Sequence, residues 1–262
     1  MITELTDRAV IALTGPEARP FLQGLVTNDV KDVSPGRAAY AALLTPQGKI
    51  LFDFLIAAGD DELLIDCRHE AREALIKRLS MYRLRSKVDI SRRDDIGVFT
   101  GLNSGVTDPR LQALGGRALM PKHEPAQDGA QDYLAKRLEL GVPEGIDFGS
   151  DQMFALDANL DELHAISYEK GCYVGQELTA RMKYRGKDRK RLLTITTKDG
   201  SPLPASGIAV TADGRDVGVI SSRYGARGFT LVRLDRLTEA SGAALEAAGV
   251  PVDVTKPIWL SP

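Results

Sequence analysis

Residues 170–177 of the 262-residue chain read KGCYVGQE, and they place a cysteine among residues that seldom surround a core cysteine. Cys172 lies between two glycines, with Lys170 two residues before it, whereas a cysteine that fills a core usually lies among aliphatic residues. A thiol reacts as its thiolate, which a nearby ammonium group and a helix N-terminus both favour. QELTARM, from residue 176, has the composition of a helix start. The stretch therefore predicts a reactive thiol at Cys172, with Lys170 biasing it toward the thiolate.

The same residues have a plainer interpretation. Cys172 could be a small buried thiol, with Lys170 merely exposed beside it. Gln176 and Glu177 either cap the following helix or orient the loop toward a ligand. Gly171 and Gly175 permit tight turns and the close approach of another molecule.

The composition argues against several classes of protein and of binding site. The chain has 34 Lys and Arg against 36 Asp and Glu, so no global basic charge indicates a nucleic-acid binder. Two cysteines and three histidines cannot build a four-ligand zinc or iron–sulfur cage within one chain, and we expect no resident metal. The N-terminus resembles neither a signal peptide nor a transit peptide, and no apolar run is long enough to span a membrane. We therefore expect a cytosolic protein that is not bound to a membrane.

The pattern of apolar residues changes along the chain. Strand-like and helix-like segments alternate up to about residue 187, including RAVIAL (8–13), HEAREALIKRLSMYRL (69–84) and QDYLAKRLELGV (131–142). From about residue 190 the segments alternate apolar and polar residues between DG, GR and GA turns. This second pattern predicts a small all-β module, most simply a barrel.

KGCYVGQE resembles the signature of the YgfZ family, folate-binding relatives of the glycine-cleavage T-protein, which is an aminomethyltransferase. Three further segments resemble the family in the same order, and with the β module they extend the resemblance over nearly the whole chain: GPEARPFLQGLVTNDV (15–30), LLTPQGKILFDF (43–54) and RLELG (137–141).

The resemblance implies an α+β fold, in which two interleaved domains form a ring around a central hole and a small β-barrel follows. The implied domains are a folate-binding domain of residues 1–47 and 132–187, an inserted α/β domain of residues 48–131 and a barrel of residues 188–262. Tetrahydrofolate would bind in the hole of a monomer. The implied role is support of iron–sulfur cluster assembly or repair, with cluster proteins or assembly factors as partners, and through cluster enzymes an effect on tRNA modification.

The resemblance also implies folate-binding residues. Asp53 and Glu139 are the carboxylates that would accept hydrogen bonds from the pterin, and the wider set adds Arg137, Asn28, Gln176 and Glu177. Each has a structural alternative: Asp53 as a solubilising acid on an edge strand, Glu139 in an ion pair with Arg137, and Asn28 in a turn.

Two other functions stay open. T-proteins carry two adjacent acids where this chain has Phe52 and Asp53, so an aminomethyl transferase is disfavoured and we expect no robust stand-alone catalysis. RMKYRGKDRKR (181–191) holds seven basic residues around Tyr184 and could bind tRNA or the anionic tail of a folate, although such stretches are usually solvated linkers.

Overall fold

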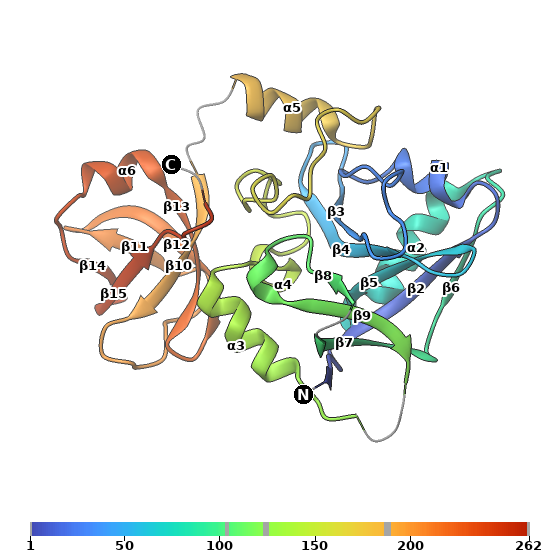
Figure 1. The fold of residues 1–262 in the computed structure, drawn as a ribbon. Coiled ribbons are helices and arrows are strands. Elements are labelled where there is room, and N and C mark those ends of the chain that lie inside the picture. The colour runs from blue at the N-terminus through green and yellow to red at the C-terminus, as the bar shows by residue number, and fades with distance from the viewer. Residues whose placement is uncertain (1, 103–104, 123–125, 186–189, 261–262) are drawn as a thin grey trace.

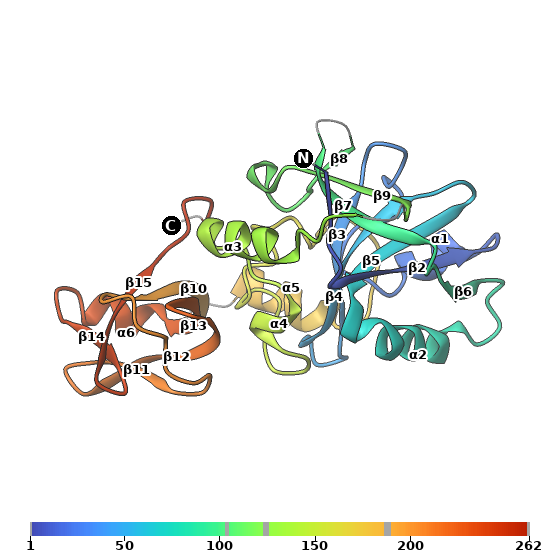
Figure 2. The ribbon, with the colours of Figure 1, turned by 90° about the horizontal axis from the view of Figure 1, so that it is seen from below.

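A computed structural model describes residues 2–102, 105–122, 126–185 and 190–260 of the chain. These residues form a five-stranded sheet, a four-stranded sheet and a closed barrel (Figure 1). Figure 2 shows the barrel beside the two sheets, with α3, α4 and α5 between them. No helix among the described residues is long and apolar enough to cross a membrane.

The five-stranded sheet has the order β3-β4-β5-β2-β6, and all its neighbouring strands are antiparallel. Its strands are β2 (Arg8–Thr14), β3 (Ala39–Leu44), β4 (Ile50–Ala58), β5 (Glu62–Arg68) and β6 (Asp89–Arg92). One face packs on α1 (Ala18–Gln23) and α2 (Arg72–Arg83), which follows a short 3-10 turn, η1 (His69–Ala71). Because side chains alternate along a strand, Ile11 and Leu13 face these helices while Val10 and Ala12 face the opposite way.

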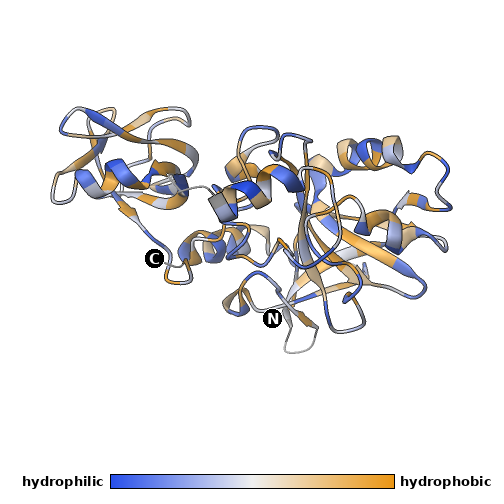
Figure 3. Cartoon of the chain, turned by 90° about the horizontal axis from the view of Figure 1, so that it is seen from above, coloured by the Kyte–Doolittle hydropathy of each residue, from blue (hydrophilic) through white to orange (hydrophobic). Residues whose placement is uncertain are grey.

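The four-stranded sheet packs against that opposite face, and its order is β1-β7-β9-β8. Its strands are β1 (Thr3–Glu4), β7 (Ile96–Leu102), β8 (Val106–Thr107) and β9 (Gly116–Pro121), with the 3-10 turn η2 (Gln112–Leu114) between the last two. The core between the sheets also includes side chains from α3 (Ala130–Leu140), α4 (Gly145–Phe148) and residues 153–166. Figure 3 shows apolar residues gathered on the strands and polar residues on the outer sides of the helices.

The barrel closes through the order β10-β13-β12-β11-β14-β15, with β15 pairing back to β10. Its elements are β10 (Lys190–Thr197), β11 (Ala209–Ala212), β12 (Arg215–Tyr224), β13 (Arg227–Arg233), α6 (Leu234–Glu239), β14 (Leu245–Ala247) and β15 (Val250–Thr255). Ile195, Val210 and Val252 point into its core. The all-β module expected from residue 190 onward is therefore confirmed.

The predicted domain boundaries stay a prediction. The first of them, between residues 47 and 48, falls in the hairpin between β3 and β4, which pair within one sheet. The core between the two sheets joins strands near the N-terminus to residues 133–173 and to Leu192 and Phe229 of the barrel. Segments far apart in the sequence thus share one apolar core.

Candidate functional site

The loop of residues 170–175 lies before α5 (Gln176–Arg185) and is anchored first by Lys170. The Lys170 ammonium donates hydrogen bonds to the carbonyl oxygens of Gln23 at 2.6 Å, Val26 at 2.5 Å and Asn28 at 3.0 Å. These bonds use all three donors of the ammonium group. Burial lowers the pKa of Lys170 to about 8, although Asp29 opposes the shift. Lys170 therefore fixes the loop to the end of α1 and the segment after it, and its predicted role as an activator of the thiol stays a prediction.

Tyr173 and Gly175 anchor the other half of the loop. Tyr173 is buried, and its ring centroid lies 5.1 Å from the Lys170 ammonium. Gly175 has a φ of +83°, and a Cβ there would lie 2.5 Å from the carbonyl oxygen of Thr45 and 3.2 Å from the Cα of Gly48. The loop therefore packs glycine against glycine on the turn between β3 and β4.

Cys172 lies between these anchors and is exposed. No atom of the described residues lies within 4 Å of the position that a Cβ at Gly171 would take, so the surface beside Cys172 is open. The other cysteine, Cys67, is buried in the core under α2, and burial raises the pKa of its thiol to about 12. The structure thus holds one accessible thiol on a fixed loop, four residues before α5, whose first turn contains Gln176 and Glu177.

Asp53 lies on β4 and is 6% exposed. One carboxylate oxygen accepts a hydrogen bond from the Tyr40 hydroxyl at 2.9 Å, and the other accepts one from the backbone N–H of Gly145 at 3.0 Å. Burial, and then the nearby Glu144 carboxylate, raises the pKa of Asp53. Both oxygens therefore already have donors within the protein.

A buried network of charges continues from Asp53 into the space between the sheets. The Arg110 guanidinium lies over the Tyr40 ring, 5.3 Å from its centroid, and donates to Glu144 at 2.7 Å and to Asp108 at 2.8 Å. Burial alone would raise the pKa of Glu144, but Arg8 and Arg110 hold it well below its usual range. The buried network comprises Arg8, Arg110, Arg117, Asp66, Asp108, Glu144 and the hydroxyl of Tyr133.

Sequence reasoning did not identify this network. The available signal was a charged residue at the edge of, or within, an apolar strand, as in LLIDC for Asp66 and GRALMP for Arg117. Its cations and anions are equal in number, three of each, so it is internally balanced.

The remaining residues predicted to bind folate make contacts of their own. Arg137 is 1% exposed and pairs with Asp147 at 2.5 Å, not with Glu139, which is exposed on α3. Asn28 donates from its amide to the carbonyl oxygens of Tyr40 and His164, each at 2.7 Å. Gln176 and Glu177 belong to α5.

Asp53, Arg137 and Asn28 already have hydrogen-bond partners within the protein, and folate binding at these positions stays a prediction. A pterin at Asp53 would have to share these two oxygens with the Tyr40 hydroxyl and the Gly145 N–H. Among the described residues, no three His, Cys, Asp or Glu side chains are arranged to hold a metal ion.

The basic stretch of residues 181–191 is partly turned inward. Lys183 pairs with Asp161 at 3.1 Å, and Arg191 pairs with Glu162 at 3.0 Å. Tyr184 is 73% exposed and meets the Tyr168 ring edge-on. Residues 186–189 lie outside the described residues. Two of the basic side chains in the described part are therefore paired with acids, and the stretch joins α5 to the barrel.

Comparison with known proteins gives matches at both ends of the chain. A family model for the GCVT N-terminal domain matches residues 1–98, and one for the CAF17 C-terminal beta-barrel domain matches residues 189–262. A relative from Mus musculus, named iron-sulfur cluster assembly factor IBA57, mitochondrial, is 33% identical, and the match covers 89% of this chain and 77% of the relative. The Homo sapiens protein of the same name is 32% identical, with 97% and 84% covered.

A solved structure has the same fold. Aminomethyltransferase T of the glycine cleavage system from Bartonella henselae matches with a TM-score of 0.74 at 16% identity, over 99% of this chain and 86% of that one. The predicted relation to the T-protein and the predicted fold class, with its C-terminal barrel, are confirmed. The prediction of a cytosolic protein is wrong on this comparison, because the named relatives are mitochondrial proteins.

Proposed function

The chain belongs to the IBA57 family of iron-sulfur cluster assembly factors, and on that premise we propose that it supports cluster assembly through the thiol of Cys172. The observation that supports this proposal is the exposure of Cys172 on a loop fixed by Lys170 on one side and Gly175 on the other. Ordering a mobile segment on binding costs free energy and weakens affinity. A fixed, accessible thiol avoids that cost when it meets a partner.

One thiol cannot hold a cluster alone, because iron–sulfur clusters in proteins take several cysteine ligands. The cluster is therefore cargo shared with an assembly factor, to which Cys172 contributes one sulfur ligand. The thiol gives up its proton when it binds iron. The open surface above Gly171 leaves room for the partner to approach the backbone closely.

Tetrahydrofolate has no necessary part in this proposal. The T-protein-like fold supports a folate site by analogy, but both oxygens of Asp53 are hydrogen-bonded within the protein. The same engagement of Asp53, together with Phe52 beside it, disfavours aminomethyl transfer. An effect on tRNA modification follows indirectly, through enzymes that need clusters.

The test is a set of three variants in cells that lack their own IBA57-type protein, with the activity of a cluster-dependent enzyme as the readout. We expect Cys172→Ser to abolish support, Cys67→Ala to retain it, and Gly171→Phe to reduce it while leaving the thiol in place. Full support by Cys172→Ser would reject the proposal. Iodoacetamide labelling of the folded protein should modify Cys172 and spare Cys67.

A further inference from the structure

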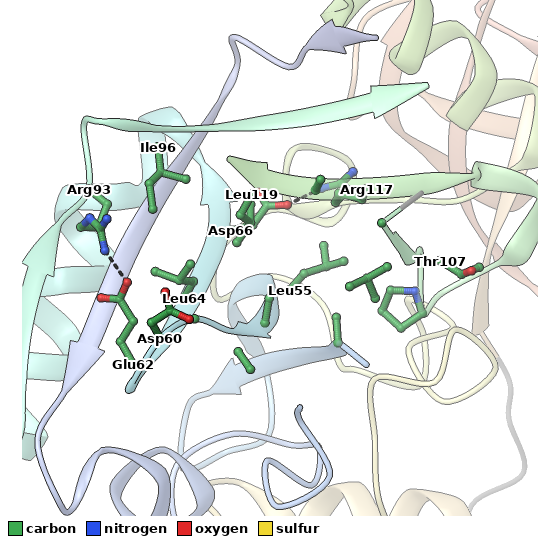
Figure 4. Close-up of a pocket in the computed structure, with 18 residues that line it drawn as sticks. Leu55, Asp60, Glu62, Leu64, Asp66, Arg93, Ile96, Thr107, Arg117 and Leu119 are labelled. Atoms are coloured by element: carbon green, nitrogen blue, oxygen red, sulfur yellow. Dashed lines mark hydrogen bonds and ion pairs between the residues drawn. The ribbon is translucent and has the colours of Figure 1, made fainter. Parts of the chain in front are cut away.

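A cavity of about 400 Å³ lies between the two sheets (Figure 4). Leu55 and Ala57 of β4 face it from one side, as do Glu62, Leu64 and Asp66 of β5. These positions alternate along their strands and therefore share one face of the sheet. β7, β8 and β9 close the other side through Ile96, Val106, Thr107, Arg117, Ala118 and Leu119. None of the residues that the sequence predicted to bind folate lines this cavity.

The walls and the size of the cavity suit a small molecule. Leu55, Leu64 and Leu119 face the space, and polar side chains that include Asp66, Thr107 and Arg117 make up much of the remaining lining. Cavities of roughly 300 to 1,000 Å³ with apolar walls and a few polar groups are the usual form of small-molecule sites. Because the space lies between two packed sheets, it favours a flat occupant over a bulky one.

A buried polar side chain, that of Arg117, lies in the wall of the cavity. Arg117 is 5% exposed and donates to Asp66 at 2.5 Å and to the Tyr133 hydroxyl at 2.6 Å. Its Nε–H is buried and has no hydrogen-bond acceptor among the described residues; the Asp108 carboxylate oxygen that pairs with it lies 3.7 Å away. A buried donor without an acceptor is unfavourable, and a ligand oxygen would relieve that deficit.

Asp66 supplies hydrogen-bond acceptors beside the donor of Arg117. One of its oxygens accepts from Arg8 and the other from Arg117. A carboxylate oxygen has two acceptor positions, so each can still accept a hydrogen bond from a ligand N–H. Arg117 and Asp66 together thus present one donor and one acceptor to the same molecule.

The buried charges of the cavity wall are already paired, whereas Asp60, which also lines the cavity, is exposed to solvent. Arg117 pairs with Asp66 in the wall, and Arg93 pairs with Glu62 nearer the rim, as Figure 4 shows. A charged ligand would lose its hydration without gaining an unpaired buried partner of opposite sign. The ionic balance therefore favours an uncharged ligand.

We propose that this cavity binds a small, flat, uncharged molecule whose edge carries a carbonyl beside an N–H, as in an amide or a lactam. The carbonyl accepts from the Arg117 Nε–H, the N–H donates to Asp66, and the body of the molecule packs on Leu55, Leu64 and Leu119. This site is separate from the thiol of Cys172 and does not depend on the function proposed for it.

Three probes of equal size and different charge test the ligand class on the full chain: benzamide, benzoate and benzylamine. We expect saturable binding of benzamide in ligand-observed NMR titrations, with benzoate and benzylamine at least ten-fold weaker. Absence of saturable benzamide binding up to its solubility limit would overturn the proposal. Equal binding of benzoate or benzylamine would overturn the assignment of an uncharged ligand.

Variants test whether benzamide binds in this cavity. Ala57→Phe fills the cavity and should remove benzamide binding without lowering the melting temperature, because the new ring enters existing space. Ala240→Phe, beside a hollow of the barrel, is the matched control and should leave binding unchanged. Arg117→Lys keeps the charge but lacks the Nε–H, and we expect benzamide to bind at least ten-fold more weakly. Unchanged benzamide affinity in Ala57→Phe would contradict the proposed position, whatever the stability of Arg117→Lys.

Discussion

Gly175→Ala tests whether the backbone of the motif loop, and not only its side chains, holds Cys172 in place. Gly175 has a φ of +83°, a conformation that a residue with a Cβ adopts at a cost. The added methyl group would also lie 2.5 Å from the carbonyl oxygen of Thr45 and 3.0 Å from the Cβ of Leu44. Both contacts involve atoms close to the backbone, so neither is relieved by rotating a flexible side chain.

The expected loss of stability follows from these two effects. The left-handed conformation costs an alanine about 1 to 2 kcal/mol, and overpacking against a rigid neighbour typically costs about 1 to 3 kcal/mol. The alanine also reduces the conformational freedom of the unfolded chain, which stabilises the folded state by about 0.4 to 1 kcal/mol. We therefore expect a net loss of about 2 to 4 kcal/mol, which corresponds to a fall in Tm of roughly 5 to 15 °C for a chain of this size.

Gly171→Ala is the matched control, because it makes the same chemical change four residues earlier in the same motif. A Cβ at Gly171 meets nothing within 4 Å, so the stability should change by no more than about 0.5 kcal/mol. Thermal unfolding followed by circular dichroism measures both variants, and iodoacetamide labelling follows Cys172. Equal melting temperatures for the two variants would refute the reasoning that Gly175 packs the loop against the β3–β4 turn.

Three further changes probe the groups around the loop and the core. Lys170→Met should lower the free energy of unfolding by about 1 to 3 kcal/mol or more in urea titrations, because buried carbonyl groups lose their donor; wild-type stability would show that water replaces the ammonium. Asp53→Ala should destabilise more than Asp53→Asn, since only asparagine keeps an acceptor for the Gly145 N–H, and equal losses would contradict that role. The lowered pKa of Glu144 contributes stability that is full above its unfolded pKa of about 4.3 and is lost as the pH falls toward the folded value. Glu144→Gln should therefore flatten the acid limb of the stability curve, and an unaltered limb would assign acid unfolding to other carboxyl groups.

The secondary structure could largely be predicted because local patterns determine it. RAVIAL predicted a strand at residues 8–13, and β2 occupies Arg8–Thr14. The helix predicted over residues 131–142 is α3, and it ends as expected at Gly141, whose φ of +69° suits a glycine. The helix predicted at 69–84 begins with a 3-10 turn and becomes α-helical only at Arg72. Glu17 takes the N-cap position of α1 without a side-chain hydrogen bond to the helix.

The buried network could not be predicted, because its partners are far apart in the sequence. Arg8 meets Asp66 across two neighbouring strands, and Arg117 reaches Asp66 from the other sheet. A chain with 34 basic and 36 acidic residues offers many such pairings, and only the packing of the sheets selects these. Asp53 shows the same limit: the sequence offered a ligand group or a solubilising acid on an edge strand, and did not indicate that its partners are Tyr40 and Gly145.

Lys170 and Cys172 show how residues two positions apart can acquire opposite roles. The expectation that the ammonium activates the thiol rested on its place two residues before the cysteine. The loop instead turns the ammonium inward, where three carbonyl oxygens take all its donors, and leaves the thiol outside. In the function we propose, iron stabilises the thiolate by displacing the thiol proton. On this argument Lys170 determines where Cys172 is held, and the partner's cluster determines when it reacts.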